Sequence, residues 1–124
     1  MTWSVLLHDA FDPEFEALPE AVRDEIFMCL PLLKTYGPHL GRPWADTLQG
    51  SRQANMKELR FKADDGVWRV AFALDPKRQA VLLVAADKSG GSEKRFYRQL
   101  IETADRRFTQ HLRDLKGTND GKNA

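Results

Sequence analysis

Two stretches of the chain, MKELRF and VWRVAF, combine residue types that could act on a phosphate group. In each stretch apolar and charged residues alternate. Leu59 is expected to face the core, so Glu58 and Arg60 in the first stretch and Arg69 in the second are expected on the opposite face. If a hairpin at ADDG pairs the strands, Arg60 and Arg69 come close together on one face. Glu58 would then balance these guanidinium charges in the free protein, and a phosphate would do so in a complex.

A third stretch, DKSGGSEKRFYRQL, joins the end of an expected strand to the start of a helix. Lys88 closes the strand, and the helix that begins after Ser92 has an N-terminus that favours anions. Four further candidates for contact with a polyanion follow on this helix: Lys94, Arg95, Tyr97 and Arg98. An ordinary capped helix with a basic exposed face explains the same pattern. Lys57 points away from Glu58 by strict alternation, so its inclusion in a site requires a bulge.

The sequence contains no motif for several other kinds of binding or catalysis. The chain has no glycine-rich phosphate loop, no dinucleotide fingerprint, no HExxH motif and no nucleophilic serine elbow. The three histidines are scattered, so we expect no metal site, and the single cysteine, Cys29, is expected in a helix core. No apolar run reaches the roughly 20 residues of a membrane span, which makes a cytoplasmic location the default. Residues 1–45 hold three basic and seven acidic side chains, so the basic excess lies in the remainder of the chain.

The hydrophobic periodicity predicts an α+β fold. Its expected elements are a strand at 2–7, a helix at 9–17, a second helix after Pro19, strands at 47–48, 56–61, 67–73 and 80–86, and a last helix from Ser92. We expect a small curved antiparallel sheet of about four strands, with two N-terminal helices on one face and a C-terminal helix. The other face is expected to stay open to a ligand. The 124 residues fit one domain, residues 1–116, followed by a disordered tail at 117–124.

This layout resembles the RelE/ParE superfamily of type II toxin–antitoxin toxins, and within it the HigB-like, phage Gp49-like branch. The resemblance is carried by LQGSRQANMKELRF, WRVAFALDPKRQAVLL, DKSGGSEKRFY and LIETADRRFTQHL, and it extends from Trp3 to about Leu112. It implies a small α+β sheet and a cognate antitoxin, expected to be a HigA-like helix-turn-helix protein. For most RelE-like members it also implies ribosome-dependent cleavage of mRNA without a metal or other cofactor.

The resemblance further implies roles for individual residues. Arg69 matches the arginine that contacts the scissile phosphate, and Lys88 and Arg60 match basic positions of two other strands. Tyr97 is similar to a C-terminal tyrosine that stacks on or orients the nucleotide. Glu58 departs from the RelE pattern, which has a lysine there, and either serves as the base or only pairs with the arginines. The predicted catalytic set is therefore Glu58, Arg60, Arg69, Lys88 and Tyr97, with RNA contacts from Lys57, Lys94, Arg95 and Arg98.

Two other functions stay open on the sequence. A ParE-like protein would inhibit DNA gyrase and cleave nothing, but such a binder needs no convergent cations on its sheet. A non-catalytic RNA-binding module has little support, because Trp44 lies on a loop and the strands carry no aromatic pair.

Overall fold

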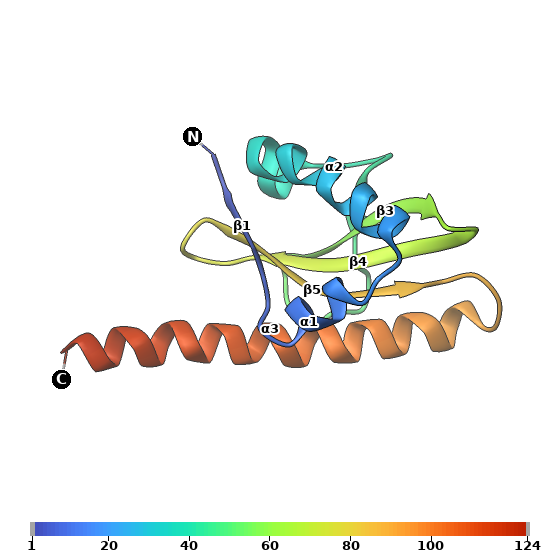
Figure 1. Ribbon diagram of the computed structural model, residues 1–124. Coiled ribbons are helices and arrows are strands. Elements are labelled where there is room, and N and C mark those ends of the chain that lie inside the picture. Colours follow the sequence, from blue (N-terminus) through green and yellow to red (C-terminus); the bar gives the residue numbers. More distant parts are fainter. Residues whose placement is uncertain (1, 124) are drawn as a thin grey trace.

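The computed structural model describes the backbone of residues 2–123 and the side chains as far as residue 117. Its elements follow one another as β1 (Ser4–Leu7), α1 (Phe11–Glu16), α2 (Glu20–Tyr36), the short 3-10 helix η1 (Gly37–His39), β2 (Ala45–Thr47), β3 (Met56–Ala63), β4 (Gly66–Leu74), β5 (Gln79–Asp87) and α3 (Glu93–Asn123). The sheet lies between α2 on one side and the long helix α3 on the other (Figure 1). The α+β class expected from the sequence is confirmed.

The sheet has five strands in the order β1-β5-β4-β3-β2. Strands β3, β4 and β5 form the expected antiparallel meander, with tight turns at the predicted ADDG and DPKR sequences. The expectation of about four antiparallel strands is wrong at one edge, because β1 pairs in parallel with β5. The two N-terminal helices lead the chain from β1 at one edge of the sheet to β2 at the opposite edge. β1 therefore pairs with β5 alone, as a parallel edge strand.

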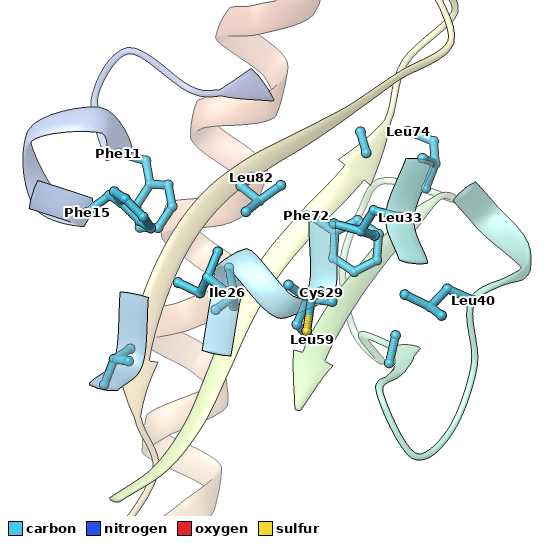
Figure 2. Close-up of a cluster of buried hydrophobic side chains, with 14 residues drawn as sticks. Phe11, Phe15, Ile26, Cys29, Leu33, Leu40, Leu59, Phe72, Leu74 and Leu82 are labelled. Carbon is cyan, nitrogen blue, oxygen red and sulfur yellow. The ribbon is translucent and has the colours of Figure 1, made fainter. Parts of the chain in front are cut away.

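The first face of the sheet is covered by α1 and α2. Val22, Ile26, Cys29 and Leu33 are buried along one side of α2, in agreement with the expectation that Cys29 lies in a helix core. They pack on side chains of β3, β4 and β5, among them Leu59, Phe72 and Leu82, as Figure 2 shows. The alternation in β3 and β4 thus assigns Leu59 and Phe72 to this face and leaves Glu58 and Arg69 for the other.

The second face is covered by α3, so the expectation of an open sheet face is wrong. Leu100, Ala104 and Phe108 of α3 are buried against residues of the sheet, which include Ala71 and Val81. The helix has an apolar stripe over several turns, and water contact along that stripe would be unfavourable. The apolar stripe of α3 therefore packs on this face, and only the parts of the face that the helix does not cover stay accessible.

Polar contacts fix α3 to the elements around it. Arg107 forms a bidentate ion pair with Glu14 of α1, with distances of 2.6 and 2.8 Å, and donates to the backbone oxygen of Leu83. The ring Nε2 of His111 lies 2.7 Å from Oδ2 of Asp75 in the β4–β5 turn. Ser92 caps the start of the helix as predicted, since its Oγ accepts a hydrogen bond from the backbone N–H of Arg95 at 3.3 Å. These contacts set the position of α3 along the sheet.

One sheet carries both hydrophobic clusters. The single domain expected at residues 1–116 stays a prediction. The disordered tail expected at 117–124 lies mostly outside the residues whose side chains are described, and it stays a prediction. Within residues 2–123 no helix is both long and apolar enough to cross a membrane.

The buried Asp75 offers a direct test of how α3 is held. Its carboxylate accepts hydrogen bonds from the backbone of Lys77 and Gln79 and from the amide of Gln79, besides the contact with His111. Asp75→Ala leaves these partly buried donors without an acceptor, and we expect it to lower the free energy of unfolding by about 2 kcal/mol. Urea denaturation measures this loss. Asp24→Ala, at an exposed position of α2, is the matched control; an equal effect of both substitutions would contradict the assignment.

Cys29 allows a test of the hydrophobic packing between α2 and the sheet. Its side chain is buried, and burial raises the pKa of the thiol from 9.0 to about 11. At pH 8 the thiolate population is then about a hundredfold smaller than for an ordinary thiol, so alkylation by iodoacetamide should be slower by at least about that factor than in urea-unfolded protein. Mass spectrometry follows the labelling. Rapid labelling of the folded protein would show that Cys29 does not lie in the core.

Candidate functional site

The candidate site begins with two arginines that face each other across neighbouring strands. Arg60 of β3 and Arg69 of β4 are directly paired in the register, as the sequence predicts. Like charges at such a position repel each other. Glu58 separates them: its Oε2 accepts a hydrogen bond from Arg60 at 2.6 Å, and its Oε1 lies 3.9 Å from Nε of Arg69. The carboxylate therefore balances both guanidinium groups in the free protein.

Tyr97 completes this cluster from α3. Its hydroxyl accepts a hydrogen bond from Nε of Arg69 at 3.1 Å and lies 3.4 Å from Oε2 of Glu58, to which it donates. The helix places Tyr97 over the strands because Leu100 and Ala104, on the same side of α3, are buried against the sheet. The four predicted residues are thus linked through Glu58, which contacts Arg60, Arg69 and Tyr97, and we call them the arginine–tyrosine cluster.

The burial of the cluster is uneven. The side chains of Glu58 and Arg69 are only 4% and 6% exposed, whereas that of Arg60 is 24% exposed. Arg69 also donates to the backbone oxygen of Trp68 at 2.9 Å, which holds its guanidinium in one orientation. Among the described residues, Oε1 of Glu58 is a buried oxygen without a hydrogen-bond partner. A buried acceptor in this state is unfavourable in a structural ion pair and is suited to accept a proton or a donor from a ligand.

Lys88 lies at the end of β5 and pairs with a residue that the sequence reasoning missed. Its Nζ donates to Oε1 of Glu93 at 2.8 Å. This hydrogen bond holds the pKa of the Glu93 carboxyl below its ordinary value, and the charges of Arg69 and Arg60 lower that pKa further. Glu93 therefore faces the same cations as Glu58 does. The sequence signal for Glu93 was its place in the first turn of the helix, where acidic residues are favoured by the helix dipole.

The four residues predicted for RNA contact take three different positions. Lys57 points to the opposite face, as strict alternation requires, and its Nζ donates to the backbone oxygens of Pro38 and Leu40. Burial lowers the pKa of this ammonium group. Lys94 and Arg95 are exposed at the start of α3, close in sequence to Glu93. Arg98 is exposed as well and lines a separate groove along α3. The structure therefore does not bring Lys57 to the arginine–tyrosine cluster.

Histidine and metal chemistry are not part of this cluster. His111 binds Asp75, and Nδ1 of His8 accepts a hydrogen bond from the backbone of Ala10 at 3.0 Å. Among the described residues no group of three or more histidine, cysteine, aspartate or glutamate side chains is arranged to hold a metal ion. The cluster instead offers cations, one carboxylate and one phenol, a set that can stabilise an anionic transition state and transfer protons.

Two solved toxin structures have the same fold as this chain. RelE in the archaeal RelE–RelB complex from Pyrococcus horikoshii matches 73% of this chain and 100% of its own chain, with a TM-score of 0.52 and 19% identity. A mutant of the E. coli toxin RelE in the free state matches 86% of this chain and 98% of its own, with a TM-score of 0.59 and 12% identity. The fold is that of the RelE superfamily.

The family follows from sequence comparison. The model of the family described as Phage derived protein Gp49-like (DUF891) matches residues 13–109. HigB2 and HigB3 of Mycobacterium tuberculosis, which both carry toxin names, are each 40% identical to this chain, over 94 and 114 residues. These matches cover 75% and 92% of this chain; the chain spans 46% of HigB2, about half its length, and 97% of HigB3. The chain belongs to the Gp49-like family, and its sequence is similar to toxins of the HigB type.

The balance of charge in the cluster can be tested through stability. Glu58→Ala leaves two adjacent guanidinium groups, one of them buried, without a carboxylate between them. We expect this change to lower the free energy of unfolding by about 3 kcal/mol, because an uncompensated buried charge is costly. Glu16→Ala, at an exposed position of α1, is the matched control in the same denaturation experiment. A stability equal to that of the control variant would show that Glu58 does not balance the arginines.

Proposed function

We propose that this chain is the toxin of a type II toxin–antitoxin system and that it inhibits translation by cleaving mRNA on the ribosome. The observation that carries the proposal is the contact of Tyr97 with Arg69 and Glu58, beside Arg60 and close to the Lys88–Glu93 pair. A structural ion pair needs one cation for each carboxylate, whereas this cluster holds two arginines on one carboxylate. An anionic ligand would balance the remaining charge.

The proposed reaction needs only groups that this chain contains. The 2′-hydroxyl beside the scissile bond attacks the phosphorus and loses its proton to Glu58, whose Oε1 is without a partner among the described residues. The bond to the 5′-oxygen breaks, which leaves a cyclic phosphate on one fragment. The leaving oxygen takes a proton from Tyr97 and becomes a 5′-hydroxyl. Arg69, Arg60 and Lys88 stabilise the charge on the phosphorane in between.

Entry of RNA requires a rearrangement at the rim of the cluster. Lys88 is bound to Glu93, whose side chain is 67% exposed, so an incoming phosphate competes with a carboxylate that water already reaches. Exposed ion pairs contribute little to stability, on the order of 1 kcal/mol or less, and this exchange therefore costs little. The 2′-hydroxyl also has to reach the buried Oε1 of Glu58, so the groups that cover Glu58 and Arg69 must open in the complex.

The partners belong to the proposal as well. A cognate antitoxin, expected to be of the HigA type, would bind the chain and block its activity, while mRNA and the ribosome would be its targets. The RelE relative from Pyrococcus horikoshii was solved as a complex with RelB, which supports an antitoxin partner for this chain.

Tyr97→Phe tests the proposal with the smallest structural change, since it removes one hydroxyl. Induction of the wild-type chain in cells should produce new 5′ ends on translated mRNA. Tyr97→Phe should reduce this cleavage by at least about tenfold, because a proton donor and a partner of Arg69 are lost. Sequencing of RNA ends measures both.

The matched control is Tyr36→Phe, since Tyr36 is 51% exposed at the end of α2. It should cleave like the wild type, with an unchanged thermal midpoint in both variants. Uncut mRNA together with relaxed or damaged DNA after induction would overturn the proposal in favour of a ParE-like gyrase inhibitor. Undiminished cleavage by Tyr97→Phe would show that the active site lies elsewhere.

A further inference from the structure

A second basic feature lies along α3, outside the arginine–tyrosine cluster. The loop between β2 and β3 and one side of α3 enclose a groove of about 670 Å³. Four arginines line it: Arg52 from the loop and Arg98, Arg106 and Arg113 from the helix. We call it the arginine groove. Three of these residues had no assigned role in the sequence analysis.

The loop that forms one wall is fixed to α3. Asp105 accepts hydrogen bonds from Oγ of Ser51 at 2.5 Å and from the backbone N–H of Arg52 at 3.0 Å. The amide of Gln53 donates to Oγ1 of Thr109 at 3.1 Å. Gly50 has a φ of +96°, and a Cβ at this position would contact Ile101 at 3.4 Å, so the loop passes close to the helix. The groove is therefore formed before any ligand binds.

The charges of the groove favour an anionic ligand. All four arginines are exposed, and within residues 2–117 none of them forms an ion pair. Glu102 and Asp105 are the acidic residues of the lining, and the carboxylate of Asp105 is already occupied by the loop. Guanidinium groups bind phosphates in a bidentate manner. A protein partner would need several apolar anchors, and the lining offers Ile101 alone as a large apolar side chain.

The groove lies next to the arginine–tyrosine cluster along the helix, since Arg98 of the groove follows Tyr97 directly in the chain. Tyr97, Ile101 and Asp105 follow one another at intervals of four residues, so they lie on one side of α3. Tyr97 contacts Glu58, while Ile101 and Asp105 belong to the groove. Arg98 and Arg113 lie 15 residues apart, which corresponds to about 22 Å along a helix. A chain of phosphates that passes Tyr97 would reach these arginines one after another.

We propose that the arginine groove binds the sugar–phosphate backbone of the RNA strand whose scissile phosphate lies at the arginine–tyrosine cluster. The inference rests on the proposed function for the choice of RNA as the polyanion. It assigns to Arg52, Arg98, Arg106 and Arg113 the task of holding the strand on one side of the cut. Contacts to phosphates position a nucleic acid without selecting its sequence.

The test measures binding separately from cleavage. The probe is a fluorescein-labelled 2′-O-methyl oligouridine of about 12 nucleotides, which lacks the attacking hydroxyl and stays intact. Arg106→Glu with Arg113→Glu should raise its dissociation constant by at least about tenfold in fluorescence anisotropy, because two phosphate contacts become repulsive. Arg106→Gln with Arg113→Gln should give a smaller loss. It should also reduce the slope of log Kd against log salt concentration by about 1.4, the value for two contacts to a single strand.

The matched control changes the net charge by the same amount elsewhere. Lys34→Glu with Lys77→Glu alters two exposed lysines, one near the end of α2 and one in the β4–β5 turn, and should change the dissociation constant by less than about threefold. Equal losses in the two reversed pairs would overturn the inference, because net charge alone would then explain binding. Wild-type binding by the groove variants would overturn it as well. If these variants also failed to bind the antitoxin, the occupant would be a protein.

The two proposals fail separately. If the wild-type chain cleaves no RNA but the groove variants lose binding, the inference stands and the proposed function fails. If cleavage proceeds and the groove variants bind as tightly as the wild type, the proposed function stands and the inference fails.

Discussion

The structure depends on the packing of α3 across the second face of the sheet. Leu100, Ala104 and Phe108 supply the burial, and the bidentate pair of Arg107 with Glu14 fixes where along the sheet the helix lies. Without this helix the second face of the sheet would expose apolar residues of β4 and β5 to water. With it, the phenol of Tyr97 comes within hydrogen-bond distance of Arg69. One packing interaction thus stabilises the fold and assembles the candidate site.

The candidate site combines charges that do not favour folding by themselves. Paired arginines on adjacent strands repel each other, and a carboxylate that lies between them loses much of its hydration. The arrangement persists because the strands pair over eight positions in this register and the helix closes over them. Charged groups held together at a cost in stability are concentrated at sites that bind a ligand.

One helix carries both features that we connect with RNA. Tyr97 faces the strands at the start of α3, and the arginine groove begins at the next residue, Arg98. The RelE structures that share this fold are at most 19% identical to the chain, so they support the fold and leave the roles of individual residues to the geometry found here. In this geometry the candidate nuclease site and the candidate path of the strand are neighbours on a rigid element.

The sequence by itself determined the α+β class, the β3–β4–β5 meander, the cross-strand approach of Arg60 to Arg69 and the turn of Lys57 to the other face. Each of these follows from alternation and turn residues, which are local properties. Only the tertiary structure decided that β1 is a parallel edge strand and that α3 covers the second face of the sheet. It also decided that Glu93 pairs with Lys88 and that four arginines line one groove. The physical reason is that these features depend on contacts between surfaces that are far apart in the sequence, and local sequence patterns do not determine which surfaces meet.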